Sequence, residues 1–310
     1  MENKPKRGFK KKTIEQTIVN QIKGWLQSIE DIELRDTVKK HYIVTGGAIT
    51  SMLQGDLPND YDVYLDNTEV AARLANYYVS RLPAVDNEKT RIPIVEVPPE
   101  GGRVTVKVKS AGIAGEDIDQ DQYDYFESYP NPNKRISQYL EGAMQKDTGK
   151  YTALAITTNA ITLTDKIQIV LRFVGPANEI HKNYDFVHTT NYFTESEGVV
   201  LNQPALESIL SKELKYVGSL YPICSMFRIK KFIQRGWTIT AGEMLKIAWD
   251  ISKLNLNDRE VLQEQLTGVD AAYFNQLISL LEEGKEIDRT YLFELVNRVF
   301  DNNWEPENDE

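Results

Sequence analysis

One short segment of this 310-residue chain, GGAITSMLQGDLPNDYDVYL at residues 46–65, combines two glycines with two closely spaced aspartates. Asp60 and Asp62 alternate with apolar residues, so a strand here would place both carboxylates on one face. Paired carboxylates repel unless a cation lies between them, and Mg²⁺ prefers oxygen ligands of this kind. Gly46 and Gly47 have no Cβ, so their backbone N–H groups could approach a phosphate. The segment therefore indicates metal-assisted phosphoryl transfer.

Two strands and a helix must position these groups. An apolar run at residues 42–44 predicts the first strand, a helical stripe follows at residues 49–53, and residues 61–65 alternate as the second strand. On that second strand we expect Tyr61, Val63 and Leu65 to face the core. The alternative is a glycine turn before a surface strand with two solvated acids, which leaves their shared face unexplained.

A Gly-Gly turn, a helix and an Asp-x-Asp strand at this spacing resemble the polymerase-β nucleotidyltransferase superfamily. The sequence of this segment is most similar to that of tRNA CCA-adding enzymes and bacterial poly(A) polymerases. Two later segments strengthen the resemblance: residues 157–161, TTNAI, and residues 227–240, FRIKKFIQRGWTIT. Thr50 and Ser51 stand where those enzymes have Arg-Asp, and their base-selecting Glu-Asp-x-x-Arg motif is not recognisable before Arg228. CCA addition itself is therefore not the expected reaction.

The resemblance implies an α+β fold, a nucleotidyltransferase head with a small mixed sheet flanked by helices, followed by an all-helical C-terminal domain. It implies transfer of a nucleoside monophosphate from an NTP, with ATP or CTP favoured, and release of pyrophosphate. Two Mg²⁺ ions would assist, with Mn²⁺ as an alternative. An RNA 3′ end such as that of tRNA is the first acceptor, and a protein or small molecule is the second. The competing hypothesis is a catalytically silent module that binds a partner.

The resemblance also implies a third carboxylate that would hold the catalytic metal with Asp60 and Asp62. Asp185 is the first candidate, because it lies among apolar residues of an expected strand, where an unpaired carboxylate is costly to bury. Asp165 is the second candidate, although ordinary turn chemistry explains an aspartate at its expected turn position better than metal binding does. A site without a third ligand is the remaining alternative.

The triphosphate would be bound by Gly46, Gly47 and Ser51, joined by cations of a later helix. Arg228 and Lys231 share one face of that helix with Arg235, at helical spacing. The opposite face carries four apolar residues: Ile223, Met226, Ile229 and Ile233. A solvated cationic face is the alternative to a phosphate-binding one. The three histidines have no metal-ligand spacing.

Charge and periodicity predict the domain organisation. Residues 1–12 hold six basic side chains and one acid, and are expected to form a basic flexible arm, whereas the chain as a whole has a net charge of −10. The catalytic domain is expected at 13–199, with an irregular acidic insertion at 110–150, a helical domain at 200–304 and an acidic tail at 305–310. Expected strands lie at 103–109, 153–163, 166–173 and 184–193, and expected helices at 13–28, 68–82, 204–216, 221–235, 240–254, 257–266, 270–283 and 287–300.

Composition excludes several classes of protein. No apolar run approaches the roughly 18 residues that a membrane span requires, and the N-terminus lacks a secretory signal. Cys224 is the only cysteine, which excludes an intramolecular disulfide and a thiolate zinc cluster. These features predict a cytoplasmic protein without membrane contact, and the divergent motifs would suit a viral gene.

Overall fold

The computed structural model describes residues 7–81, 93–99, 101–108, 150–156 and 159–258, together with residues 261, 262, 265, 288, 290, 291, 293, 294 and 297. Most of the expected acidic insertion, the first half of the basic arm, the helix expected at 270–283 and the acidic tail lie outside these residues. The arm is not free throughout: Gly8 packs against the Leu53 carbonyl, and the Phe9 amide donates to the Met52 carbonyl over 2.9 Å.

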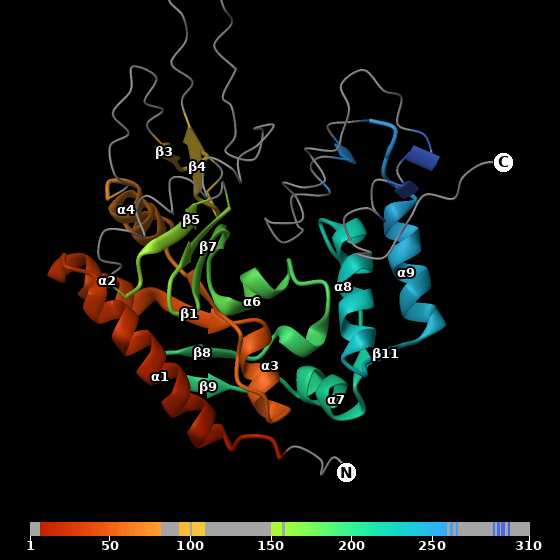
Figure 1. Cartoon of the computed structure of the whole chain (residues 1–310), viewed down its shortest axis with the longest axis horizontal. Coiled ribbons are helices and arrows are strands. Elements are labelled where there is room, and N and C mark those ends of the chain that lie inside the picture. Colours follow the sequence, from red (N-terminus) through yellow and green to blue (C-terminus); the bar gives the residue numbers. More distant parts are fainter. Residues whose placement is uncertain are drawn as a thin grey trace, which may run out of the picture.

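A mixed seven-stranded sheet organises the first two thirds of the chain, in the order β5-β6-β7-β2-β1-β8-β9 (Figure 1). β2 and β7 are parallel and the other neighbours are antiparallel. The strands are β1 (Tyr42–Thr45), β2 (Tyr61–Leu65), β5 (Ala153–Ile156), β6 (Ala160–Leu163), β7 (Ile167–Val174), β8 (Tyr192–Thr194) and β9 (Gly198–Val200). The α+β class and the small mixed sheet flanked by helices are confirmed.

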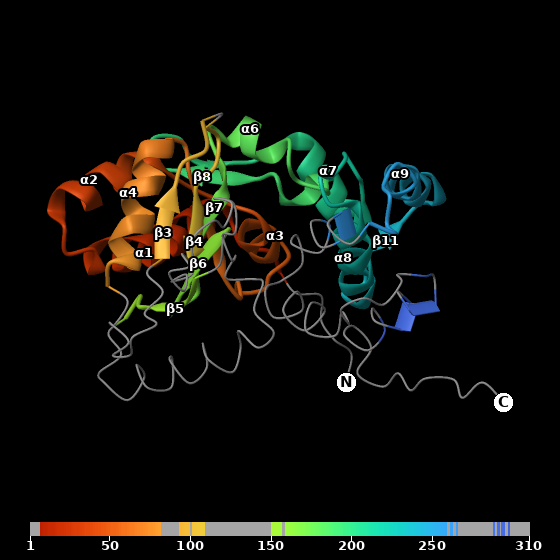
Figure 2. The same cartoon turned by 90° about the horizontal axis from the view of Figure 1, so that it is seen from above.

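Helices cover both faces of this sheet. The elements are α1 (Lys11–Ser28), α2 (Ile32–His41), α3 (Gly47–Leu53), α4 (Thr68–Val79) and α6 (Ala177–His181). Helices α1, α2 and α4 lie together on one side, as Figure 2 shows, and with α3 they enclose the main core. Helix α6 covers part of the opposite face, where Ala177 and Ile180 pack on Ile43 and Tyr64.

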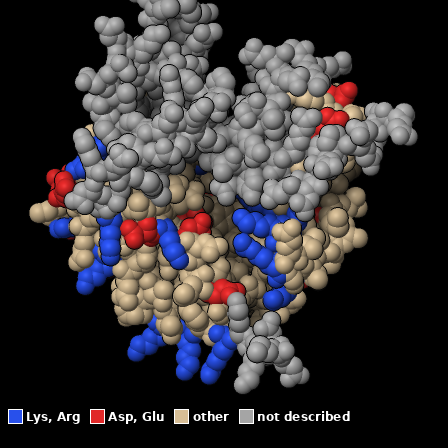
Figure 3. Space-filling model, in the orientation of Figure 1, with Lys and Arg blue, Asp and Glu red and all other residues tan. Residues whose placement is uncertain are grey.

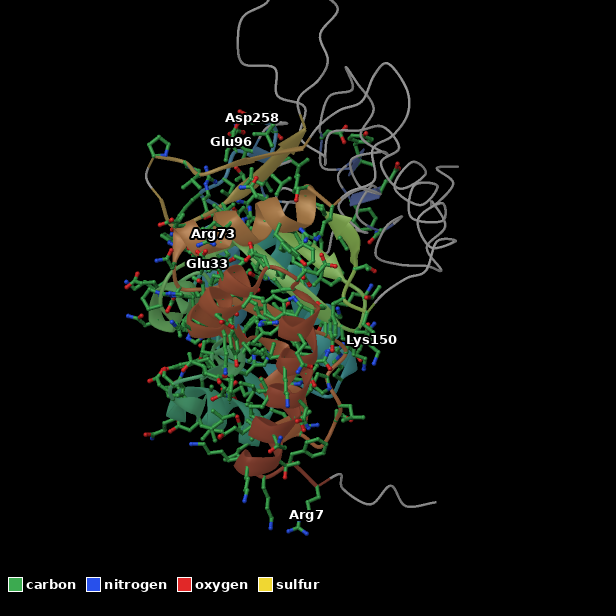
Figure 4. All side chains as sticks on the ribbon, turned by 90° about the vertical axis from the view of Figure 1, so that its left-hand side faces the viewer. Arg7, Glu33, Arg73, Glu96, Lys150 and Asp258 are labelled. Carbon is green, nitrogen blue, oxygen red and sulfur yellow. The ribbon has the colours of Figure 1, made fainter. Side chains whose placement is uncertain are left out.

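The sequence explains why the first helices form. The stripe of Ile14, Ile18, Ile22 and Trp25 on α1 is at most 1% exposed, as its helical spacing predicts. The helix expected at 13–28 begins two residues earlier, at Lys11, so Thr13 lies inside it. The prediction also omitted α2, whose N-cap Asp31 accepts a hydrogen bond from the Leu34 amide. Its Glu33 meets Arg73 of α4 at 3.1 Å (Figure 4).

Helices dominate the described chain after residue 200, around a second core. They are α7 (Gln203–Ser211), α8 (Pro222–Gln234) and α9 (Ala241–Ile251), with a short parallel pair, β10 (Glu213–Leu214) and β11 (Thr238–Ile239), that the prediction lacks. The helix expected from residue 240 is α9, and Thr240 is its N-cap, whose side chain accepts from the Glu243 amide. The second core includes Phe186, so the segment before the expected boundary at 199 also packs with the helices.

Strand prediction was less accurate than helix prediction. The run expected as one strand at 153–163 is the hairpin of β5 and β6, and β4 (Thr105–Val108) pairs with an unpredicted β3 (Pro93–Glu96). The strand expected at 184–193 is wrong: it contains an isolated bridge at Phe186, the 3₁₀ helix η2 (Val187–Thr189) and only the start of β8. None of the helices in the described residues could cross a membrane.

Candidate functional site

Asp62 projects from β2 on the face opposite the main core. Tyr61, Val63 and Leu65 are buried in that core, as predicted, so the alternation of the strand turns Asp62 and Tyr64 the other way. Asp62 is half-buried, whereas Asp60 precedes the strand and is exposed. Both carboxylates therefore stand at the start of β2, and only Asp62 is fixed by the strand itself.

The glycine turn is built around the Asp62 carboxylate. Gly46 has φ +90° and ψ −146°, a conformation that essentially only glycine adopts. A Cβ at this position would lie 2.7 Å from Asp62 Oδ2, whereas Gly47 has open space where its Cβ would be. The Gly46 amide donates to the Thr189 carbonyl over 3.2 Å, so it is engaged within the protein. Gly46 thus makes room for Asp62, and its amide, one of the expected phosphate contacts, is already bonded within the protein.

Helix α3, which follows this turn, is hydrogen-bonded to η2. Thr50 of α3 is buried, and its hydroxyl donates to the His188 carbonyl over 2.7 Å. Ser51, expected to contact the triphosphate, is half-buried one turn after Gly47. Because η2 follows Asp185 closely in sequence, these bonds bring the Asp185 segment to the glycine turn.

Asp185 forms an ion pair. Its Oδ2 lies 2.6 Å from Arg228 Nη1 on α8, and its side chain is only 10% exposed against 44% for Arg228. Burial alone would lower the pKa of Arg228, but the Asp185 charge and hydrogen bond outweigh it and raise that pKa. Arg228 therefore neutralises the charge of Asp185. Asp185 was a metal-ligand candidate because an unpaired carboxylate is costly to bury, and this ion pair removes that cost without a metal.

The expected three-carboxylate metal centre is not assembled. Among the described residues, which include Asp60, Asp62 and Asp185, no three His, Cys, Asp or Glu side chains come together as a metal site. The second candidate, Asp165, has φ +58° in the turn before β7, and its Oδ2 accepts from the Tyr151 amide. It is a turn residue, as the alternative interpretation held. Asp60 and Asp62 remain as the carboxylates that could hold a metal.

The buried Tyr64 side chain lies near enough to both Asp62 and Asp185 for their charges to change its pKa. Burial raises the pKa of Tyr64 above its ordinary value, and the charge of Asp62 raises it further. Arg228 and Asp185 act on the same pKa in opposite directions. The three charged groups therefore lie within electrostatic reach of one side chain, and α8 belongs to the surroundings of Asp62.

Sequence reasoning missed His181, which supports the strand next to Asp62. Thr45 of β1 is the Cα partner of Asp62, and its hydroxyl lies 2.9 Å from His181 Nε2 and 3.0 Å from the Asn191 carbonyl. Since the hydroxyl proton goes to that carbonyl, we assign the proton of the other bond to Nε2 of His181. Burial lowers the pKa of His181 to about 4, so the ring is neutral at pH 7. No spacing in the sequence signals this contact.

The cationic face of α8 is only partly as expected. Basic side chains gather over this helix in Figure 3. Lys231 is exposed, as is Arg235 just after the helix. The apolar face is narrower than predicted, because Met226 and Ile233 are 52% and 51% exposed. Of the two cations predicted on α8 to bind phosphate, Lys231 is exposed, whereas Arg228 is paired with Asp185.

Comparison with known proteins identifies a family. A family model described as Gabija anti-defense 2 family protein matches residues 16–212, well over half of the chain. A protein named Gabija anti-defense 2, from Bacillus phage SPbetaL7, is 24% identical over 204 residues, which are 65% of this chain and 48% of that protein. The chain therefore spans about half the length of this curated relative.

Several solved structures of CCA-adding enzymes share part of the chain path. A Thermotoga maritima enzyme complexed with tRNA has a TM-score of 0.38 at 10% identity, covering 92% of this chain and 57% of that one. A Bacillus stearothermophilus enzyme in complex with CTP has a TM-score of 0.38 at 12% identity, covering 83% and 51%. At these scores the likeness says nothing about activity.

Proposed function

The chain belongs to the Gabija anti-defense 2 family, and we propose that it serves this anti-defense role as a metal-dependent nucleotidyltransferase. In the proposed reaction, a hydroxyl oxygen bonds to the α-phosphorus of an NTP while the bond from that phosphorus to pyrophosphate breaks. The hydroxyl proton passes to water, and the nucleoside monophosphate stays on the acceptor. A phage gene product acting in the cytoplasm of its host fits the organism of the curated relative.

The observation that carries this proposal is the contact between Gly46 and Asp62. The backbone adopts a glycine-only conformation there, and the space that a Cβ would fill holds a carboxylate oxygen. A protein that used Asp62 only as a solvated surface acid would have no need for this arrangement. Strained backbone at a charged position is typical of functional sites.

The residues present fit a magnesium or manganese ion that is shared with the nucleotide. Mg²⁺ is usually bound through one or two carboxylates together with substrate phosphates and water, and Asp60 and Asp62 supply that number. Such an ion would contribute charge stabilisation at the transferred phosphoryl group. The expectation of two ions, with ATP or CTP as the favoured nucleotide, remains part of the proposal.

The chain's own cations would hold the triphosphate. Lys231 is exposed on α8 and can meet a phosphate as a point charge, and the backbone amide of Gly47, the first residue of α3, is the second expected contact. Arg228 donates through Nη1 to Asp185, so a phosphate that it contacts would share this cation with Asp185. Ser51, one turn along α3, is the remaining nucleotide-binding candidate.

The test is transfer from each labelled NTP in the presence of Mg²⁺, first to total RNA and then to the soluble proteins of a host lysate. We expect label on one acceptor fraction together with pyrophosphate release. Asp62→Asn and Asp60→Asn should abolish both, whereas Asp36→Asn, an exposed acid on α2, should not. Absence of pyrophosphate with every acceptor would exclude the transferase.

A second candidate function is a catalytically silent nucleotidyltransferase-like module that binds a protein partner. The ion pair of Asp185 with Arg228 favours it, because that pair removes the residue expected to complete the catalytic site. The same assay separates the two functions. A silent module would bind nucleotide or partner without pyrophosphate release, and Asp62→Asn would then leave its anti-defense effect intact.

A further inference from the structure

Asp62 belongs to a row of polar side chains that crosses the sheet. Its Cα partners are Thr45 on β1 and Gln168 on β7, and Gln168 is in turn the partner of Thr162 on β6. The neighbours of these residues along each strand are buried in the main core. Alternation therefore places all four polar side chains on the face that carries Tyr64.

The polar side chains on the two sides of Asp62 in the sheet differ in whether they form hydrogen bonds with the described residues. On the β1 side, Thr45 is fully buried and its hydroxyl is bonded to His181 and to the Asn191 carbonyl. On the other side, Gln168 and Thr162 are half-buried, and neither side chain bonds to a residue that the structure describes. Half-buried polar groups without a protein partner can bond to a ligand without breaking an internal bond. The β7 and β6 side is thus the one equipped to receive a ligand.

We propose that Gln168 and Thr162 bind the terminal ribose of an RNA acceptor. The assignment of the acceptor to the β7 and β6 side rests on the transferase proposed above. In that reaction the attacking and leaving oxygens lie roughly in line, on opposite sides of the transferred phosphorus. The glycine turn follows β1, so phosphates held at Gly47 place the leaving pyrophosphate on the β1 side of Asp62. The attacking hydroxyl must then approach over β7 and β6.

The chemistry of these side chains fits a sugar diol. Gln168 offers an amide donor and a carbonyl acceptor, and Thr162 offers a hydroxyl, all uncharged. The 2′- and 3′-hydroxyls of an RNA end are donors and acceptors of the same kind. Arg172, on the same face of β7, lies over the ring of Tyr221 at 3.9 Å, and Tyr221 is the N-cap residue of α8. The basic helix therefore adjoins this face and can meet the phosphates that precede the terminal ribose.

The experiment compares RNA ends on the unmodified protein. A short fluorescein-labelled single-stranded RNA, ending either in a 2′,3′-diol or in a 2′,3′-dideoxynucleotide, is titrated with full-length protein, Mg²⁺ and α,β-methylene-ATP. Loss of the diol should weaken binding roughly tenfold, the effect of one or two hydrogen bonds. Equal affinity for both ends, or no binding of RNA at all, as for a protein acceptor, would overturn the proposal.

Variants then locate the effect. Gln168→Leu and Thr162→Val should weaken binding of the diol end and leave the dideoxy end unchanged, because partners in one interaction are not additive. The matched control is Thr194→Val on β8, which lies on the same face beyond β1 and should keep the full preference. If the two variants instead weaken binding of α,β-methylene-ATP, they contact the nucleotide and the assignment is wrong. A preference for the diol without any pyrophosphate release would reject the transferase and retain the RNA subsite.

Discussion

Two carboxylates expected to share one metal, Asp62 and Asp185, have opposite surroundings. Gly46 has no side chain and so leaves space for the Asp62 carboxylate, whereas the guanidinium of Arg228 neutralises the Asp185 carboxylate. Both arrangements make a partly buried carboxylate tolerable, the first by leaving space beside it and the second by supplying a cation. The comparison teaches that neighbours, more than the acid itself, decide whether an aspartate is a ligand or a structural anion.

The largest expected effect is on the Asp62 side. Gly46→Ala forces a Cβ against Asp62 Oδ2 and a residue into a glycine-only conformation, so we expect about 1–3 kcal/mol lower stability. Displacing Asp62 should also reduce transfer by more than roughly 100-fold, because reacting groups tolerate little misplacement. Chemical denaturation and the labelled-NTP assay measure the two effects.

Gly47→Ala is the matched control for stability. Its Cβ meets nothing within 4 Å and the residue begins α3, so alanine should be neutral or add up to about 1 kcal/mol. A loss of stability at Gly47 equal to that at Gly46 would show that the turn as a whole, and not the contact with Asp62, requires glycine.

The next effect is on the Asp185 side. Asp185→Ala leaves Arg228 without its partner, and because Arg228 is 44% exposed, solvent limits the loss to about 1–2 kcal/mol. Transfer should fall less than tenfold in this variant if Asp185 is structural. If activity is abolished while the protein stays folded, Asp185 has a catalytic role and the distinction between the two acids fails.

Histidine titration gives a pH-dependent effect beside Asp185. Burial lowers the pKa of His188 to about 4, and its ring packs on Phe232 and Trp237. The unfolded chain binds this proton near pH 6.5, so stability should be lost as pH falls from about 6.5 towards 4, by up to ~1.4 kcal/mol per pH unit. His188→Phe should flatten the curve measured by denaturation at each pH. An unchanged slope would mean that other groups control acid unfolding.

The smallest expected effect is at the start of α1, remote from both acids. Lys10, Lys11 and Lys12 are exposed there, near Arg7, which Figure 4 shows at the same end. Replacing the three lysines by glutamine should weaken RNA binding a few-fold and lower its salt dependence, at a slope of about 0.7 per lost phosphate contact. Stability should rise slightly, because cations oppose the dipole at a helix N-terminus. Unchanged RNA affinity across salt concentrations would remove the lysines from the binding surface.

The sequence allowed the elements around Asp62 to be predicted because their signals are local. Alternation identified Tyr61, Val63 and Leu65 as core residues, and the helical stripe containing Trp25 identified α1. The glycines also marked the turn. The contact between Gly46 and Asp62 was beyond prediction, since it depends on the pairing of β1 with β2 and on the backbone angles of one residue.

Positions fixed by distant partners could not be predicted. The apolar run around Asp185 resembles a strand, yet Phe186 packs with Trp237 and Ile247 in a core made mostly by later helices. Gln168 carried no motif, and only strand register places it beside Asp62. Asp31 did offer a local capping signal for α2, so that omission was an error of interpretation rather than missing information.

The ion pair between Asp185 and Arg228 also has an evolutionary consequence. Asp185 lies inside the stretch of chain that the family model matches, whereas Arg228 lies beyond residue 212, where that match ends. The cation that balances Asp185 thus comes from a helix outside the matched stretch. A protein that shared only the matched stretch would have to balance a carboxylate at this position in another way.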